Sequence, residues 1–171
     1  MNTKITKSIF CALMFGIISF SGCSDKAKKT SKKVTKAKVY PSDVIPFMDE
    51  WKILCGDGTR FNDLAKVEHK DFFYVENENN TNWVVYKTPN SGITSRTSSN
   101  TRTELGQKKH WIPEEGGKLN GTLKVKHVST SGDARVAASY SVVVGQIHSD
   151  EGHENEPIKI FYKKFPGHTK G

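Results

Sequence analysis

The sequence is poor in cysteine, and the few cysteines present are badly placed for cross-linking. Only Cys11, Cys23 and Cys55 occur in 171 residues. The first two fall in the N-terminal region discussed below, so Cys55 is left alone in the remainder. This excludes a disulfide framework within one chain. We expect Cys55 to be a buried, small apolar residue and not a nucleophile, because no other motif points to it.

The folded part also has no excess of charge of either sign. The formal net charge is +8, but residues 1–38 contain nine lysines and one acid, Asp25. The other 133 residues contain 17 basic and 17 acidic groups. Nucleic-acid binding therefore loses its main support. A neutral domain that binds a polyanion must do so with a local cluster of cations.

No apolar run is long enough for a comfortable membrane span. Lys4 and Lys7 precede an apolar stretch at 8–20, which is followed by Ser-Gly-Cys at 21–23. This pattern predicts a secretory signal. The small residues before Cys23 resemble a bacterial lipobox, which implies cleavage before Cys23 and lipidation of its thiol. An ordinary signal peptide with a chance cysteine is the alternative.

We therefore expect a lipoprotein signal at 1–22 and a lysine-rich, flexible tether at 23–38. The tether is rich in Lys, Ser, Thr and Ala and has no aromatic residue, so it cannot bury enough apolar surface to fold. The protein is expected to be exported, and either lipid-anchored to the bacterial outer membrane or cell surface, or secreted. The domain would occupy 39–171.

Within that domain, helix signals are scarce. Only 40–54 offers a short turn, opened by Pro41, Ser42 and Asp43. Short β-rich runs alternate with polar, glycine-containing turns, which predicts an all-β sandwich or barrel. The expected strands lie at 71–75, 82–87, 101–105, 121–128, 134–148 and 158–164.

Two of these strands carry paired polar residues. Because the side-chain period of a strand is two residues, Arg102 shares a face with Glu104, and Gln146 shares one with His148. The second pair ends an apolar run, where polar groups need partners or a ligand. Taken alone, Gln146 and His148 would fit a solvated strand end, and Arg102 with Glu104 a surface ion pair.

Taken together, the segments Arg-Thr-Glu-Leu (102–105) and Gln-Ile-His (146–148) resemble alginate lyases of polysaccharide lyase family 7. Trp-Lys-Ile at 51–53 is similar to the early Trp-Lys-Leu strand of that family, and the resemblance covers roughly 45–171. It implies a concanavalin-like jelly roll, a β-sandwich whose concave sheet forms a substrate groove. Further similarity lies at 72–74, 83–86, 94–107, 160–164 and 166–167.

The resemblance also implies β-elimination on a 1,4-linked uronate polymer. Arg102 and Gln146 would stabilise charge at the sugar carboxylate, and His148 would be a base or charge neutraliser. Glu104 would hold Arg102 in place. No metal or organic cofactor is implied. The expected partners are alginate or a related anionic polysaccharide and, through the lipid, a membrane; the protein is expected to be a monomer without nucleic acid.

Two departures from the family pattern matter. Gly106 stands where a second arginine usually follows Leu105, and Arg96 and Lys163 are the candidates to supply the missing cation. The late motif that carries the family's catalytic tyrosine does not occur, and no tyrosine present is assigned that role. Because 166–171 also has turn composition, we expect the chain to be a C-terminally incomplete copy of the domain.

Other functions are compatible with the sequence to different degrees. A metal site could be built from His148, Asp150, Glu151, His153, Glu154 and Glu156, but their spacing fits no helix-borne zinc motif. A glycosidase would want two acids on one strand face, which no apolar strand here carries. A surface lipoprotein that binds uronate polymers without cleaving them, and a lyase acting on another polyuronate such as glucuronan, are the remaining alternatives. Mannuronate or guluronate preference, and endo or exo attack, are not distinguished.

Overall fold

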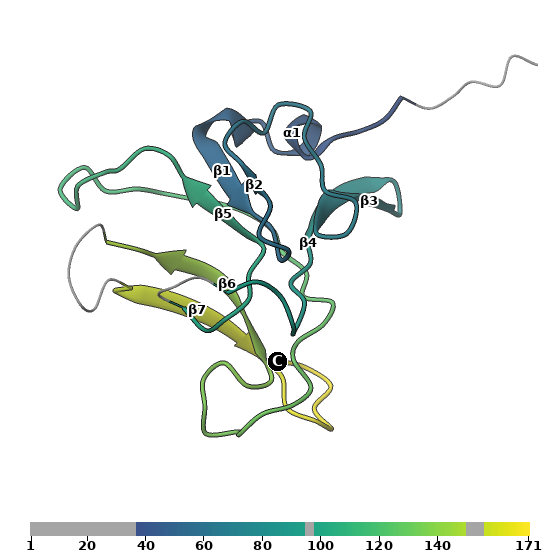
Figure 1. The fold of residues 1–171 in the computed structure, drawn as a ribbon, viewed down its shortest axis with the longest axis vertical. Coiled ribbons are helices and arrows are strands. Elements are labelled where there is room, and N and C mark those ends of the chain that lie inside the picture. Colours follow the sequence, from purple (N-terminus) through teal and green to yellow (C-terminus); the bar gives the residue numbers. More distant parts are fainter. Residues whose placement is uncertain (1–36, 95–97, 150–155) are drawn as a thin grey trace, which may run out of the picture. The chain divides into compact units, whose positions relative to one another are not determined.

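Short strands dominate the secondary structure of this computed structural model, which describes residues 37–94, 98–149 and 156–171 (Figure 1). Helix is limited to α1 (Pro41–Val44) and a 3-10 turn, η1 (Met48–Glu50). The strands are β1 (Trp51–Leu54), β2 (Arg60–Phe61), β3 (Phe73–Glu78), β4 (Thr81–Tyr86), β5 (Glu104–Gln107), β6 (Ser141–Ile147) and β7 (Ile158–Lys163). The prediction of an all-β chain is confirmed.

Several predicted features lie outside the described residues. They are the signal peptide, Cys23, nearly all of the tether, Arg96 and the acidic loop at 150–155. Within the ranges that are described, no helix is long and apolar enough to cross a bilayer.

The predicted turn near Tyr40 is α1. Pro41 opens it, where the absent N–H costs no helical hydrogen bond. The carboxylate of Asp43 accepts a hydrogen bond from the Tyr40 backbone N–H at 2.9 Å. The turn leads through η1 into β1, so that the strand begins at Trp51 as the sequence pattern indicates.

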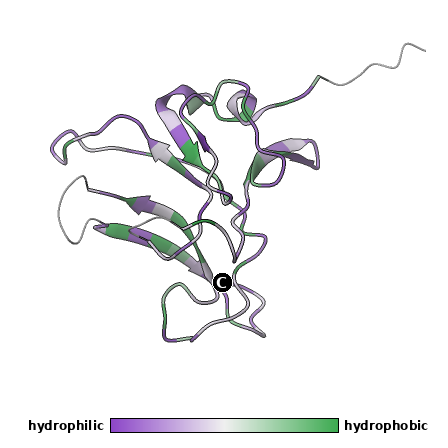
Figure 2. Ribbon diagram, viewed as in Figure 1, coloured by the Kyte–Doolittle hydropathy of each residue, from purple (hydrophilic) through white to green (hydrophobic). Residues whose placement is uncertain are grey.

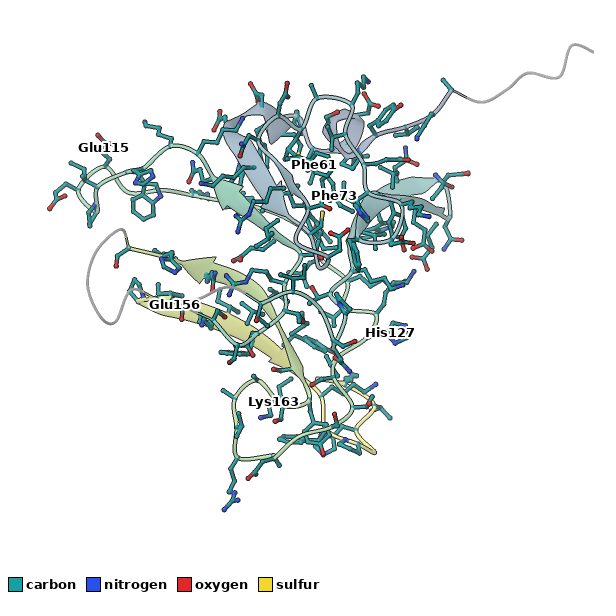
Figure 3. All side chains as sticks on the ribbon, in the orientation of Figure 1. Phe61, Phe73, Glu115, His127, Glu156 and Lys163 are labelled. Carbon is teal, nitrogen blue, oxygen red and sulfur yellow. The ribbon has the colours of Figure 1, made fainter. Side chains whose placement is uncertain are left out.

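The core is organised around Ile53. The strands form three antiparallel sheets, ordered β2-β1-β5, β3-β4 and β6-β7. In the first sheet Ile53 lies opposite Phe61 and Leu105, and residues opposite each other share a face. This face packs toward Phe73 of β3; Figure 3 labels Phe61 and Phe73. The fully buried apolar residues are Met48, Ile53, Cys55, Leu64 and Phe73.

Two glycines allow the turn after β1 to approach the segment that leads into β5. A side chain at Gly56 would collide with the ring of Pro89, and one at Gly92 would collide with the Gly56 carbonyl oxygen. That carbonyl accepts a hydrogen bond from the Ile93 N–H at 3.0 Å. The chain between β4 and β5 is thus held against the end of β1.

The β6-β7 hairpin is more exposed. None of its described residues is fully buried, and Figure 2 shows that much of it is hydrophobic. A bulge shifts the register between Val143 and Gly145. The strand also begins later than the predicted 134, because 134–140 forms turns and Tyr140 has a φ of 56°. Its large exposed apolar side chains are Val143, Ile147, Ile158 and Ile160.

The predicted strand at 121–128 does not form a ladder in this structure. Its side chains instead reach β3: Lys124 Nζ lies 2.7 Å from a carboxylate oxygen of Glu78, and Lys126 Nζ lies 2.8 Å from one of Glu76. The alternating pattern predicts which residues face outward, but a strand also needs a partner edge for its backbone groups. Among the described residues, 121–128 pairs with no strand.

Candidate active site

The candidate site begins on the face of the β2-β1-β5 sheet that is turned away from the core. Leu54 lies opposite Arg60 on one side and Glu104 on the other, so these three side chains share that face. Arg102 precedes Glu104 by two residues and contacts it. The strand period therefore places both members of the predicted pair on one surface, together with Arg60, which the sequence did not single out.

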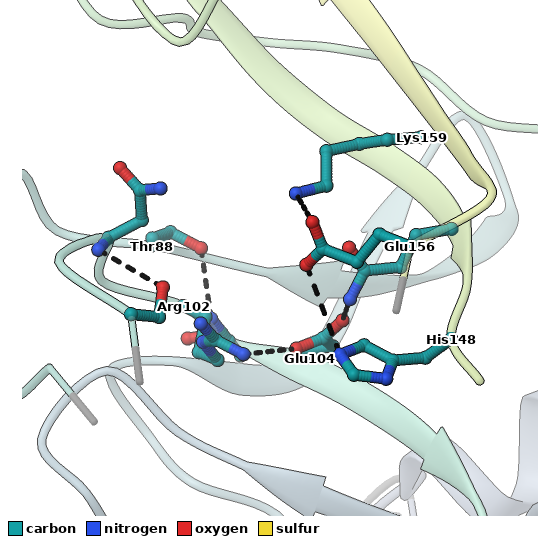
Figure 4. Close-up of polar contacts among 10 residues, drawn as sticks. Thr88, Arg102, Glu104, His148, Glu156 and Lys159 are labelled. Atoms are coloured by element: carbon teal, nitrogen blue, oxygen red, sulfur yellow. Dashed lines mark hydrogen bonds and ion pairs between the residues drawn. The ribbon is translucent and has the colours of Figure 1, made fainter. Parts of the chain in front are cut away.

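Thr103 fixes this pair from the opposite side of the chain. It is 9% exposed. Its hydroxyl donates to the Lys87 carbonyl oxygen at 2.7 Å. Its backbone N–H donates to the Thr88 hydroxyl at 3.1 Å (Figure 4). Because both groups of Thr103 are satisfied toward the interior, Arg102 and Glu104 point the other way.

The carboxylate of Glu104 joins the two segments that the sequence singled out. Nη1 of Arg102 donates to one carboxylate oxygen at 3.4 Å, and the side-chain amide of Gln146 donates to the other (Figure 4). Arg102 and Glu104 are about one-third exposed at their side chains, 29% and 33%. Groups far apart in the chain thus form one half-buried polar cluster, which we call the Glu104 bridge (Arg102, Glu104 and Gln146).

The bulge in β6 helps to aim Gln146. One extra residue, Val144, separates the pair Val143–Phe161 from the pair Gly145–Ile160. Such a bulge reverses the alternation beyond it and commonly re-aims a side chain next to a functional site. The face of Gln146 therefore cannot be read by counting from the apolar residues at the start of β6.

His148 lies beside the Glu104 bridge without a hydrogen bond to it. Its Nε2 is 4.0 Å from Glu156, and its Nδ1 is 3.0 Å from the Ser149 carbonyl oxygen. Lys159 also donates to Glu156 (Figure 4). That hydrogen bond lowers the pKa of Glu156 below its ordinary value, and the charges of Lys159, His148 and Arg102 act in the same direction. Glu156 is therefore an ionised partner for His148.

A half-open depression of about 290 Å³ adjoins the Glu104 bridge. Two guanidinium side chains, Arg60 and Arg102, line it, whereas its one acid is engaged elsewhere. Asp57 accepts a hydrogen bond from the Thr59 N–H at 3.0 Å and lies 3.1 Å from His69. The remaining lining residues are Leu54, Gly58, Ile93 and Thr94. The depression is cationic and large enough for a small anionic group.

Lys163 lies apart from the other predicted site residues. It pairs with Ser141 at the opposite end of the β6-β7 hairpin from Gln146 (Figure 3). Its ammonium donates to the carbonyl oxygens of Ala134 and Val136 at 3.2 and 2.9 Å. It therefore does not supply the cation expected near position 106. The structure instead places Lys52 of β1 directly opposite Gly106.

Other chemistries find little support in the described part of the chain. It holds no cluster of three or more His, Cys, Asp or Glu side chains that could bind a metal ion. Cys55 is 1% exposed, as predicted for a core residue, and burial raises its thiol pKa to about 11.

Sequence reasoning missed Arg60, Lys52, Glu156 as a partner of His148, and Lys159. Arg60 lies in a strand of only two residues, too short for any periodicity to reveal. The other three acquire their positions from strand pairing or from a hairpin connection. These three residues could have been identified only with the correct strand register of the sheets.

The chain is similar to known alginate lyases in sequence and in fold. A family model described as alginate lyase matches residues 45–171. An alginate lyase from Klebsiella pneumoniae is 29% identical over 135 residues, which is 63% of this chain and 41% of that protein. The crystal structure of the exolytic PL7 alginate lyase AlyA5 from Zobellia galactanivorans is similar with a TM-score of 0.74 and 85% identity, covering 77% of this chain and 42% of that one. The chain spans about two fifths of the length of both relatives, and the likeness confirms the predicted jelly-roll fold.

Proposed function

Because this chain belongs to the alginate lyase family, we propose that the protein depolymerises alginate by β-elimination at 1,4-linked uronate residues. The observation that carries the proposal is the Glu104 bridge. A guanidinium from the segment just before β5 and a side-chain amide from β6 are held by one carboxylate at the surface. Both are donors suited to a sugar carboxylate, so this arrangement fits an anionic substrate.

The chemistry requires charge stabilisation first. The C5 proton of a uronate is not acidic while the neighbouring carboxylate carries its full charge. Arg102 and Gln146 donating to that carboxylate would stabilise the enolate-like charge that develops as the C5–H bond breaks. The electron pair then forms the C4–C5 double bond, and the C4–O4 bond breaks.

Two proton transfers complete the reaction. A base accepts the C5 proton, and an acid protonates the departing O4. His148, at the edge of the Glu104 bridge and exposed, is available as base or charge neutraliser. Glu104 acts through the donors that it holds and is a positioning residue.

The depression beside Arg102 supports an anionic ligand. Arg60 and Arg102 line it together, and within the described residues Arg60 has no ion-pair partner. A uronate carboxylate there would meet two guanidinium groups. We infer that this depression accommodates part of the polymer next to the reacting sugar.

The test is formation of unsaturated uronate, followed by its ultraviolet absorbance when purified protein meets alginate. Arg102→Ala and Gln146→Ala should abolish most of the rise. Arg135→Ala is the matched control, because the Arg135 side chain is 90% exposed and, among the described residues, forms an ion pair only with Asp133. If the unmutated protein forms no product from mannuronate, guluronate or glucuronan polymers, lyase activity is excluded.

We further propose exolytic attack. The support is the 85% identity with AlyA5, whose structure is described as that of an exolytic enzyme. An exolytic enzyme releases one small product from the first minutes, while the viscosity of the polymer solution falls slowly. A rapid fall in viscosity with a ladder of intermediate oligosaccharides would contradict this mode.

Binding without cleavage is the second candidate function. In the described part of the chain, no tyrosine hydroxyl is hydrogen-bonded to Arg102, Gln146 or His148, although the family resemblance calls for a tyrosine acid. Retardation of the protein in an alginate-containing native gel, lost in Arg102→Ala and without unsaturated product, would support this candidate. Retardation that survives Arg102→Ala would contradict it.

We also propose that the protein acts outside the cytoplasm, anchored by lipid on Cys23. The support is the sequence pattern at 1–23. Cells fed a labelled fatty acid should incorporate label into the unmutated protein and not into Cys23→Ser. Label retained in Cys23→Ser, or protein found only in the cytoplasmic fraction, would contradict the proposal.

A further inference from the structure

Lys52 is a cation on the site face of the β2-β1-β5 sheet. It lies opposite Gly106 in the antiparallel register of β1 and β5, two residues from the pair formed by Leu54 and Glu104. Residues two apart along a strand share a face. Lys52 therefore projects from the same surface as Glu104 and Arg102, and not toward the core.

The Lys52 side chain packs against β5 at Gly106. A Cβ atom placed on Gly106 would lie 3.5 Å from Lys52 Cε and 3.7 Å from its Cγ, which are ordinary contact distances. Because both ends of the aliphatic stem lie this close, the stem runs from β1 across β5. The ammonium group is thereby carried over β5, the strand that also bears Glu104.

Lys52 also differs from many of the other lysines in having no polar partner among the described residues. It is exposed and makes no hydrogen bond or ion pair with a described residue. By contrast, Lys124, Lys126 and Lys159 are each held by a carboxylate. An unpaired ammonium that lies across a glycine beside a polar cluster is available to bind an anion from solution.

The spacing suits a polymer with a charge on every sugar. At about 3.4 Å per residue, position 106 lies roughly 7 Å beyond Glu104 along β5. A carboxylate bound there would belong to a different sugar from the one that contacts Arg102 and Gln146. Lys52 would thus act on substrate affinity and leave the chemical step unchanged.

We propose that Lys52, lying across Gly106, binds the carboxylate of a uronate adjacent to the reacting sugar. This inference rests on the proposed function for the identity of the ligand. It makes Lys52 a substrate-binding residue that recognises charge and whose stem packs against β5 at Gly106.

The test compares Lys52→Met, which keeps the stem and removes the charge, with Lys52→Arg, which keeps the charge. Lys70→Met is the matched control, since Lys70 is also exposed and has no recorded partner among the described residues. The expected result for Lys52→Met is a KM for alginate oligosaccharides raised roughly 3- to 10-fold, with kcat within about twofold of the unmutated value, as for loss of one partly solvated ionic contact. Lys52→Arg and Lys70→Met should stay within about twofold in both constants.

Two further arms separate charge recognition from a structural effect. Carboxyl-reduced alginate oligosaccharide, used as a competing ligand, should bind Lys52→Met and the unmutated protein equally. In Lys52→Met/Gly106→Arg, an arginine projects from the vacated position on the same face and should recover at least half of the lost affinity. Equal behaviour of Lys52→Met and Lys70→Met, or no recovery in the double variant, would overturn the proposal.

Retardation in alginate-containing native gels gives a readout that needs no turnover. If the unmutated protein is retarded but forms no product, the proposed lyase function fails, while reduced retardation of Lys52→Met alone still upholds the present inference. If product forms and Lys52→Met is retarded like Lys70→Met, this inference fails and the lyase function stands. A protein that neither binds nor cleaves alginate contradicts both.

Discussion

Glu104 holds the two donors of the site, so its removal should impair activity far more than stability. In Glu104→Ala, the guanidinium of Arg102 and the amide of Gln146 lose their common acceptor. Neither donor is deleted, and both can then rotate toward solvent. We therefore expect the variant to bind and turn over alginate poorly because its donors are no longer preorganised.

The magnitude follows from the two contacts. A hydrogen bond to a charged group contributes about 1.5–3 kcal/mol. The ion pair with Arg102, at 3.4 Å between groups that are one-third exposed, contributes at most about 1 kcal/mol. A combined loss of about 1.5–4 kcal/mol corresponds to a fall in kcat/KM of roughly 10- to 900-fold.

A double-mutant cycle measures this coupling. Glu104→Ala, Gln146→Ala and the double variant are compared by initial rates of unsaturated-product formation, with thermal unfolding measured alongside. If Glu104 acts by positioning Gln146, the double variant should be less than about threefold worse than the worse single variant. Glu76→Ala is the control, because it removes a salt bridge to Lys126 on β3 and should leave kcat/KM unchanged.

Independent, multiplicative losses in the double variant would refute the reasoning. So would a Glu104→Ala variant whose kcat/KM is normal, or one whose loss of activity follows a collapse of the thermal unfolding temperature.

Three further predictions follow from the same structure. Arg60→Gln should raise KM roughly 3- to 10-fold at constant kcat, measured by initial rates, since Arg60 shares the depression with Arg102. Cys55→Ser should lower the free energy of unfolding by about 1–3 kcal/mol in urea titrations, because it buries a hydroxyl in the core; peptide mapping should also show native Cys55 resisting alkylation at pH 8, since burial raises its pKa to about 11. The Thr59 N–H lowers the pKa of Asp57, so this carboxylate stabilises the fold above about pH 4 and loses that effect as the pH falls further. The melting temperature of Asp57→Asn should accordingly fall less steeply between about pH 5 and 3 than that of the unmutated protein.

The fold follows from the sequence where local patterns suffice. The opening turn at Pro41, the strand at Trp51 and the succession of short strands are all set by local chemistry and side-chain period. The segment at 121–128 shows the limit, because its alternation is real but strand formation depends on a neighbouring edge. The late start of β6 is also not evident from local composition. Residues 134–140 form turns, and the last of them, Tyr140, has a left-handed backbone conformation.

The site divides in the same way. The strand period predicts that Arg102 and Glu104 lie on one side of the chain, and they are in contact although β5 begins only at Glu104. That Gln146 reaches Glu104 depends on the tertiary arrangement and on the bulge after Val143, which single-residue counting cannot anticipate. Lys163 illustrates the converse, since its charge made it a candidate although its ammonium is satisfied by two backbone carbonyls.

The two halves of the Glu104 bridge differ in how firmly they are held. β5 belongs to a sheet whose other face packs in the core through Ile53 and Leu105, whereas no described residue of β6 or β7 is fully buried. The position of Gln146 on β6 therefore depends strongly on polar contacts, each contributing only a few kcal/mol. A substrate carboxylate that accepts hydrogen bonds from both Arg102 and Gln146 binds the assembled arrangement better than an open one. Substrate must then stabilise the assembled site, by a free energy that grows with the logarithm of its concentration over its dissociation constant. Glu104 holds Arg102 and Gln146 together before substrate binds. Its removal should therefore lower activity mainly because the two donors are no longer preorganised.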